Sequence, residues 1–334
     1  MSTPPSAASG LTPARLAPDA RRLAEDVAYY LSQTPRQLPS QYLYDDLGSA
    51  LFEAICRLPW YRIARIEEQL LQQHAGHILQ RHGTPSSLVE LGPGSGSKLA
   101  ALLDSSPPRR RLPVHLVDVS AAALDASARA IEAHHVAIAT HLAEYETGLA
   151  EAMEGSEGQA LVLFLGSNIG NFDPPGAEAF LRAVRAAVGA GGRLLLGTDL
   201  VKPEPELRLA YDDPLGVTAA FNRNLLVRIN RELGANFDVD GFAHEVRWDA
   251  GTARVEMHLV SRRRQDVQIP AAGLEITLED GEAIWTESSY KYKADDVAIM
   301  LARAGFGTLD QWSGNRYALT LAEVVVRDER RGTE

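Results

Sequence analysis

The sequence predicts an α/β fold in which a doubly wound, largely parallel sheet carries an inserted α+β lobe. Three observations predict it. Between Leu88 and Leu200, short apolar runs alternate with stretches of helical periodicity, which is typical of parallel strands covered by helices on both faces. A glycine-rich loop follows the first apolar run and opens a helix. After Val201 the pattern changes to helices followed by strands that alternate apolar and polar residues.

The first elements are helical. A charged helical pattern covers Asp19–Leu31, and apolar residues at Ile66, Leu70, Leu71 and Ile78 predict an amphipathic helix that leads into the glycine-rich loop. The strands that follow are expected at Leu88–Leu91, Val114–Val117, Ala160–Gly166 and Gly192–Leu200. The helices between them are expected at Lys98–Asp104, Ala121–His134 and 174–188.

The chain after Val201 predicts a separate lobe. A helical stretch follows a proline-marked break, and "FAHEVRWDAGTARVEMHLV" predicts an antiparallel hairpin with its turn near Asp249–Gly251. A last helix and two strands are expected to return to the first sheet. We therefore expect a disordered leader at 1–16, a lobe from 17–65 plus 200–286, and a sheet domain from 66–199 plus 287–334.

Composition excludes several classes of protein. The 334 residues carry a net charge of −11, which disfavours a non-specific nucleic-acid or anionic-membrane surface. No apolar run approaches the length of about 18 residues that a membrane span needs. Cys56 is the only cysteine, so a cysteine-based metal site is excluded and a reducing, cytoplasmic location is expected.

The glycine-rich loop predicts a small-molecule site. Gly92-Pro93-Gly94-Ser95-Gly96 does not match the G-x-G-x-x-G spacing of dinucleotide enzymes. Asp118, at the end of the second strand, is placed to accept both ribose hydroxyls, and Glu144 with Tyr145 to contact an adenine. Acidic residues suit a sulfonium nucleoside, S-adenosylmethionine, better than NAD. A dinucleotide site and a purely structural turn are the alternatives.

Further polar residues are expected at the same sheet edge. "FLGSNIGNFDP" follows a buried strand, and Asn168 and Asn171 offer neutral amides that can hold a carboxylate or cap the next helix. For Asn168 a structural role is favoured. Strand alternation in "IWTESSYKYK" puts Glu287 and Ser289 on one face, a pair able to grip an imidazole, although a solvated strand face is the alternative.

The chain resembles a known family at this point: the S-adenosylmethionine-dependent histidine N-alpha-methyltransferases of ergothioneine biosynthesis and their relatives that methylate tryptophan-like amines. The resemblance spans about Leu38 to Val326. It rests on "YLYDDLGSALFEAICRLP", "LVELGPGSGSK", "FLGSNIGNFDP", "LLLGTDLVKP", "AYDDP", "VEMHL" and "TESSYKY". It implies a Rossmann-like class I methyltransferase domain, a substrate-binding lobe and methyl transfer to the α-amino group of L-histidine, which forms hercynine.

The resemblance also implies roles for individual residues. Tyr44, Gly92, Lys98, Asp118 and Gly166 match cofactor-pocket positions of the family. Gly94, Glu144 and Tyr145 are expected in the same pocket from the glycine-rich loop and the order of the strands alone. Asn171 and Tyr211 are expected to hold the acceptor's carboxylate, and Glu287 and Ser289 its imidazole, with Met257 against that ring. Tyr61, with Tyr44, is expected at the reacting amine.

Two motifs depart from the family pattern. "LPWYRIAR" replaces the usual "LPEYYPTR", which keeps tryptophan or another amine open as the acceptor, and Ala143-Glu144-Tyr145 replaces a Gly-Asp-aromatic motif. The presence of Met257, Glu287 and Ser289 favours histidine over an indole, which would have no use for a buried carboxylate of this kind. An oxidoreductase and a non-catalytic binding protein are the alternatives from other classes. No metal, nucleic acid or membrane is expected, and the protein is expected to act as a monomer.

Overall fold

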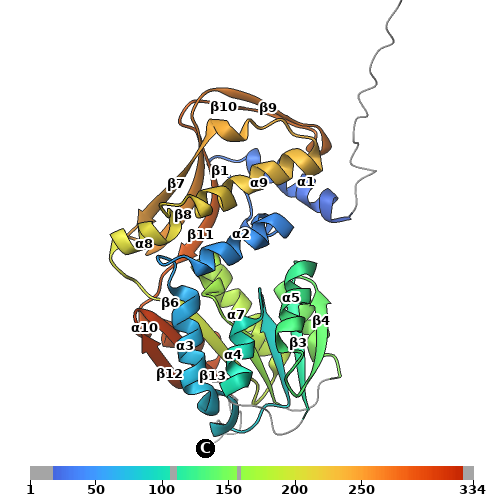
Figure 1. Ribbon diagram of the computed structural model, residues 1–334, viewed down its shortest axis with the longest axis vertical. Coiled ribbons are helices and arrows are strands. Elements are labelled where there is room, and N and C mark those ends of the chain that lie inside the picture. Colours follow the sequence, from blue (N-terminus) through green and yellow to red (C-terminus); the bar gives the residue numbers. More distant parts are fainter. Residues whose placement is uncertain (1–17, 106–110, 156–158, 326–334) are drawn as a thin grey trace, which may run out of the picture. The chain divides into compact units, whose positions relative to one another are not determined.

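The computed structural model describes residues 18–105, 111–155 and 159–325, so the expected leader at 1–16 lies outside the described residues. The described chain forms two compact units (Figure 1). Unit 1 comprises Met1–Phe52, Tyr211–Arg247 and Glu256–Glu287, as far as these are described. Unit 2 comprises Glu53–Ala210, Trp248–Val255 and Ser288–Glu334, with the same restriction.

The described part of unit 2 is built on a seven-stranded sheet in the order β12-β13-β6-β5-β2-β3-β4. The five strands from β6 to β4 are parallel, and β13 and β12 return antiparallel at the β6 edge. The predicted doubly wound sheet and the return of the last two strands are therefore confirmed. The strands are β2 (Ser87–Leu91), β3 (Leu112–Asp118), β4 (Val136–Leu142), β5 (Ala160–Phe164), β6 (Arg193–Asp199), β12 (Phe306–Gly314) and β13 (Tyr317–Val324).

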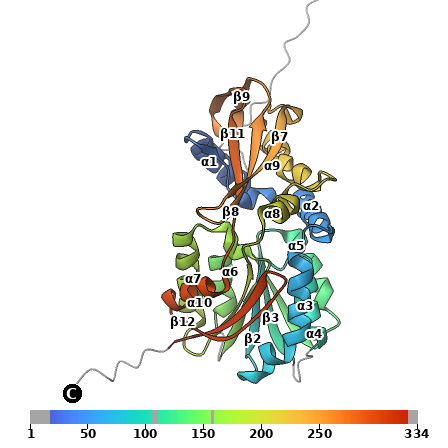
Figure 2. The same ribbon diagram turned by 90° about the vertical axis from the view of Figure 1, so that its left-hand side faces the viewer.

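Helices cover both faces of this sheet. Figure 2 shows α6, α7 and α10 on one side and α3, α4 and α5 on the other. The helices and turns of unit 2 are α3 (Ile63–Gly76), η3 (His77–Arg81), α4 (Ser97–Ser105), α5 (Ala121–Ile131), α6 (Tyr145–Met153), η4 (Asn168–Asn171), α7 (Pro174–Val188) and α10 (Ala294–Arg303). Because both faces are covered, β2, β5 and β6 are buried along their whole length, which explains their uninterrupted apolar runs.

The strand β4 was not among the predicted elements. Only its first residue, Val136, is buried, and it forms the free edge of the sheet beside β3. Its weak apolar pattern agrees with this exposure, because the residues after Val136 alternate between half-buried and exposed.

Unit 1 combines a small sheet with helices. Its four-stranded sheet has the order β1-β11-β8-β7, and β9 and β10 form a separate antiparallel pair. The expected hairpin is confirmed as β7 and β8, whose turn is closed by Asp249 accepting from the backbone of Gly251 at 2.9 Å. The strands are β1 (Arg36–Gln37), β7 (Phe242–Asp249), β8 (Arg254–Ser261), β9 (Gln265–Ile269), β10 (Leu274–Leu278) and β11 (Ala283–Tyr290).

The helices of unit 1 are α1 (Pro18–Leu31), η2 (Ser40–Leu43), α9 (Val217–Leu233), η5 (Val239–Gly241) and η6 (Pro270–Ala272). The division between the units falls within α2 (Asp46–Arg57), before the last residue of α8 (Glu204–Tyr211), and within β7, β8 and β11. Among the described residues, no helix combines the length and apolar character needed to cross a membrane.

Candidate active site

The loop between β2 and α4 lies at the carboxyl end of the parallel strands and contains three glycines, whose backbone has no Cβ atom. The backbone φ angles of Gly92, Gly94 and Gly96 are +71°, +56° and +76°. Residues other than glycine rarely adopt such positive values. A Cβ on Gly92 would lie 3.0 Å from Asn168 Nδ2 and 3.1 Å from Tyr145 Oη. A Cβ on Gly96 would lie 2.6 Å from the Cα of Ser127 in α5. The glycines thus serve both turn geometry and close packing.

Asp118 lies beside this loop, as expected from the sequence. It ends β3, which pairs with β2, and Gly92 N–H donates to the carbonyl of Val117 at 2.8 Å. Its carboxylate accepts from Ser120 N at 2.9 Å. Burial raises the pKa of Asp118, and amide hydrogen bonds from Ser120 and Gly94 offset only part of that effect. The carboxylate therefore favours ligand groups that donate hydrogen bonds to it.

Tyr145 joins the same place from the start of α6. Its ring packs edge-on against Phe164, with centroids 5.2 Å apart, and its hydroxyl is near Gly92. Glu144 precedes it at the N-cap of α6, where its carbonyl accepts from Gly148 N at 2.8 Å. The structure thus brings Gly92, Asp118 and Tyr145 together within unit 2.

Glu90 is a buried acid near the carboxyl end of β2, only 1% exposed. Its Oε2 has no hydrogen-bond partner among the described residues. Burial raises the pKa of Glu90 to about 8, although the charge of Lys98 lowers it. An unpartnered buried carboxyl is costly unless a ligand supplies a donor, so Glu90 suits a ligand that brings a cationic or N–H group.

Lys98, expected in the cofactor pocket, forms an ion pair with Glu67. Lys98 Nζ lies 2.7 Å from Glu67 Oε2, and Glu67 is fully buried in α3. Burial alone would lower the pKa of Lys98, but the Glu67 carboxylate outweighs this and raises it. The same carboxylate accepts from the backbone of Gly166 at 2.8 and 2.9 Å and from the hydroxyl of Tyr317 at 2.5 Å. Lys98 and Gly166 are therefore held by one acid.

Sequence reasoning missed Glu67. The signal was present, since Glu67 lies on the apolar face of α3, one helical turn from Ile63 and from Leu70 and Leu71, all of which are buried. An acid on such a face must be buried and needs partners.

The segment after β5 places both asparagines. Gly166 and Ser167 have positive φ, and Ser167 Oγ accepts from the backbone of Asp199 at 2.9 Å. Asn168 and Asn171 begin and end η4. The cap of α7 is Asp173, whose carboxylate accepts from Gly176 N at 2.8 Å, so the alternative that an asparagine caps this helix is wrong.

Ser289 lies against η4. A Cβ on Gly170 would lie 2.7 Å from the carbonyl of Tyr290 and 3.5 Å from Ser289 Oγ. Tyr292 also donates to the carbonyl of Ile169 at 3.2 Å. The short helix that carries Asn171 and the strand end that carries Ser289 are thus packed together within unit 2. Tyr61, also in unit 2, is buried just before α3.

Within unit 1, one buried amide connects several expected site elements. Asn222 is fully buried and donates to His244 Nδ1 at 2.9 Å, and His244 Nε2 donates to the carbonyl of Tyr211 at 2.8 Å. Thr286 lies within hydrogen-bond distance of Asn222 Oδ1, at 2.6 Å, and of the carbonyl of Met257, at 3.0 Å. One hydrogen-bond network therefore connects the carbonyls of Tyr211 and Met257. Asn222, at the centre of this network, was not predicted from the sequence.

Glu287 follows in the same strand of unit 1. Its carbonyl accepts from Trp285 Nε1 at 2.8 Å, and the residue is half-buried.

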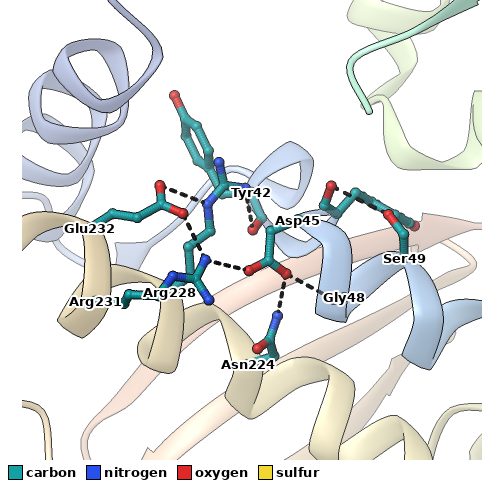
Figure 3. A network of polar contacts seen from close by, with 9 residues as sticks. Tyr42, Asp45, Gly48, Ser49, Asn224, Arg228, Arg231 and Glu232 are labelled. Atoms are coloured by element: carbon teal, nitrogen blue, oxygen red, sulfur yellow. Dashed lines mark hydrogen bonds and ion pairs between the residues drawn. The ribbon is translucent and has the colours of Figure 1, made fainter. Parts of the chain in front are cut away.

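Tyr44 is fixed by aromatic and polar contacts in unit 1. Its ring packs against Phe52 and Phe221, each with a centroid distance of 5.5 Å. Figure 3 shows the polar network beside it, in which Asp45 accepts from Asn224 at 2.6 Å and Arg231 at 2.7 Å. Burial alone would raise the pKa of Asp45, but these hydrogen bonds and that of Gly48 N lower it overall. The segment before α2 is thereby tied to α9.

The sheet order of unit 2, with antiparallel β13 beside β6 and a glycine loop next to Asp118, defines a Rossmann-like class I methyltransferase domain. The chain belongs to the family of histidine-specific, S-adenosylmethionine-dependent methyltransferases, because the model of that family matches residues 23–324.

Relatives with assigned names are similar over most of the chain. A histidine N-alpha-methyltransferase of Mycolicibacterium smegmatis is 39% identical over 309 residues, which are 91% of this chain and 95% of that protein. The protein of the same name from Mycobacterium tuberculosis is 41% identical over 314 residues, 92% and 97% of the two chains. Ergothioneine biosynthesis protein 1 of Neurospora crassa is 27% identical over 295 residues, which are 86% of this chain but 33% of the fungal protein.

Proposed function

We propose that this protein transfers methyl groups from S-adenosylmethionine to the α-amino group of L-histidine and forms the trimethyl betaine, hercynine, for ergothioneine biosynthesis. The observation that carries the proposal is the similarity to histidine N-alpha-methyltransferases across more than nine-tenths of the chain. We further propose that it acts as a monomer in the cytoplasm, where the single Cys56 would stay reduced.

The residues of unit 2 fit S-adenosylmethionine. The loop at Gly92 and Gly94 offers backbone without a Cβ in the way, and Asp118 offers a carboxylate beside it. The unpartnered oxygen of Glu90 suits an ammonium group such as that of the methionine part. When bound, S-adenosylmethionine supplies a methyl group carried on a positively charged sulfur. Lys98 and Gly166, tied together by Glu67, would complete this pocket.

The acceptor residues follow from the family pattern. We assign Asn171 and Tyr211 to the carboxylate of histidine, and Glu287, Ser289 and Met257 to its ring. Met257 and Ser289 are 2% and 6% exposed, which suits contact with a ring that is removed from water. Glu287 would accept the ring N–H, and Ser289 would complement the other nitrogen. Holding both ends of the molecule leaves its α-nitrogen as the nucleophile.

The amine must lose a proton before it can accept a methyl group. Even peptide α-amino groups have a pKa of about 7.7–8.0, so the ammonium form is abundant at neutral pH. We assign Tyr61, with Tyr44, to orient the amine and to pass its proton to water. These neighbours are uncharged, so they tolerate the positive charge that remains on a trimethylated nitrogen better than a lysine would.

A panel assay tests the proposal. The purified protein is incubated with S-adenosylmethionine and each free amino acid in turn, and S-adenosylhomocysteine release and product mass are measured. The proposal predicts turnover with histidine and a product heavier by three methyl groups. Turnover of tryptophan without turnover of histidine would show that tryptophan, and not histidine, is the acceptor. The absence of turnover with every amino acid would contradict the proposal.

A further inference from the structure

Behind Ser289 lies a buried cation that the family pattern does not assign. The side chain of Lys291 is 0% exposed, and its Nζ donates to Ser289 Oγ at 2.8 Å. The same Nζ lies 3.1 Å from Asp199 Oδ2, and Asp199 is itself 1% exposed at the end of β6. A buried lysine is costly unless its charge is paired, and here the pairing carboxylate and the serine hydroxyl fix its position.

We infer that Lys291 is a specificity-determining positioning residue that makes the Ser289 hydroxyl a hydrogen-bond donor toward the substrate ring. An ammonium group has three donors and no acceptor, so Ser289 Oγ must accept from Lys291. This directs the hydroxyl hydrogen toward an acceptor atom elsewhere. The inference rests on the proposed binding of histidine by Ser289.

A donating hydroxyl recognises one form of the imidazole. The neutral ring has one N–H, assigned above to Glu287, and one nitrogen with a lone pair, which accepts from a hydroxyl. A second N–H at that position would face the hydrogen of the Ser289 hydroxyl and would bring a positively charged ring within one hydrogen bond of the Lys291 ammonium, which repels it. Lys291 therefore selects a ring that presents a lone pair to Ser289, which an indole or phenyl ring lacks.

Replacing the side chain of Lys291 leaves the backbone hydrogen bonds around it in place. Its N–H donates to the carbonyl of Ala253 at 2.8 Å, and Tyr292 N donates to the carbonyl of Asp199 at 3.1 Å. Lys202 also pairs with Asp199, with its Nζ 2.5 Å from Oδ1. Lys202→Met is therefore a matched control that removes a lysine from the same carboxylate.

The test is a double-mutant cycle on KM for histidine at saturating S-adenosylmethionine. Lys291→Met and Ser289→Ala should each raise KM for histidine by about tenfold or more, the usual effect of losing a charge-assisted or buried hydrogen bond. The double variant should be no worse than Ser289→Ala alone. The affinity for S-adenosylmethionine, measured by calorimetry, and KM in Lys202→Met should change by less than about twofold.

Two results would overturn the inference, and they are distinguishable. If Lys291→Met raises KM as much in the Ser289→Ala background as in the native chain, Lys291 does not act through Ser289. If Ser289→Ala leaves KM for histidine unchanged, the proposed ring site is wrong and the inference falls with it. Should Lys291→Met fail to fold, Asp199→Asn/Lys291→Met takes its place in the cycle with the same expectations, because it removes both buried charges together.

Discussion

Glu67 and Lys98 form an ion pair with an N–O distance of 2.7 Å, and Glu67 also accepts from the backbone of Gly166. This acid therefore holds two expected cofactor residues that are far apart in the sequence. Tyr317 also donates to Glu67, and its pKa is raised by burial and by the Glu67 charge, so it stays protonated.

Replacing this acid tests whether it organises the cofactor pocket. Glu67→Gln should destabilise the protein by about 1.5–3 kcal/mol, because the fully buried side chain loses the charge that strengthens its hydrogen bonds to Gly166 and Tyr317 and its ion pair with the half-buried Lys98. Affinity for S-adenosylmethionine should fall by about tenfold or more, since Lys98 loses the counter-charge that holds its ammonium group in place. Urea unfolding and calorimetry measure the two effects. Glu68→Gln, whose hydrogen bond to Gln72 is exposed, is the control and should change neither by much.

Cofactor binding is predicted to depend on the positive φ of Gly92 and on the absence of a Cβ atom at this position. Gly92→Ala should cost about 1–2 kcal/mol for its φ of +71° and should weaken S-adenosylmethionine binding at least about tenfold, because the new Cβ crowds Asn168 and Tyr145. Gly234→Ala carries a similar φ of +68° with open space around the Cβ. A loss of binding in Gly234→Ala, or full binding in Gly92→Ala, would contradict this account of the loop.

The network around Asp45 predicts a pH-dependent contribution to stability (Figure 3). Because hydrogen bonds from Arg231 and Gly48 hold the pKa of Asp45 below its usual value, its contribution is present above the unfolded pKa of about 3.9. It is lost as the pH falls through the lower folded pKa. Asp45→Asn should therefore lower the free energy of unfolding by about 1 kcal/mol at pH 7 and by progressively less as the pH falls below the unfolded pKa of about 3.9.

Urea unfolding of both proteins at a series of pH values checks this. A difference that is constant from pH 7 to pH 3 would show that the Asp45 charge contributes nothing and that the asparagine merely changes the packing.

Much of the fold was predictable because parallel strands buried on both faces are continuous apolar runs. Asp118 was placed beside Gly92 for a related reason: neighbouring parallel strands end at the same edge of the sheet. The strand β4 escaped prediction because it lies at the sheet edge and buries little. Glu67 and Asn222 also escaped, since their partners come from distant parts of the chain and only the folded structure shows them.

Histidine recognition by Glu287 gives a prediction for the acceptor. Glu287→Ala should raise KM for histidine well above tenfold, because a hydrogen bond to a charged group contributes about 1.5–3 kcal/mol. Affinity for S-adenosylmethionine should stay unchanged in the same protein. Steady-state kinetics and calorimetry provide the two values, and an unchanged KM would show that the ring is bound elsewhere.

The most direct test of the central claim is NMR of the product made from histidine and S-adenosylmethionine with a 13C-labelled methyl group. The account predicts a single N-methyl resonance from three equivalent methyl groups on the α-nitrogen, with the imidazole nitrogens unmodified. A labelled methyl group on the ring or on the carboxylate would contradict it.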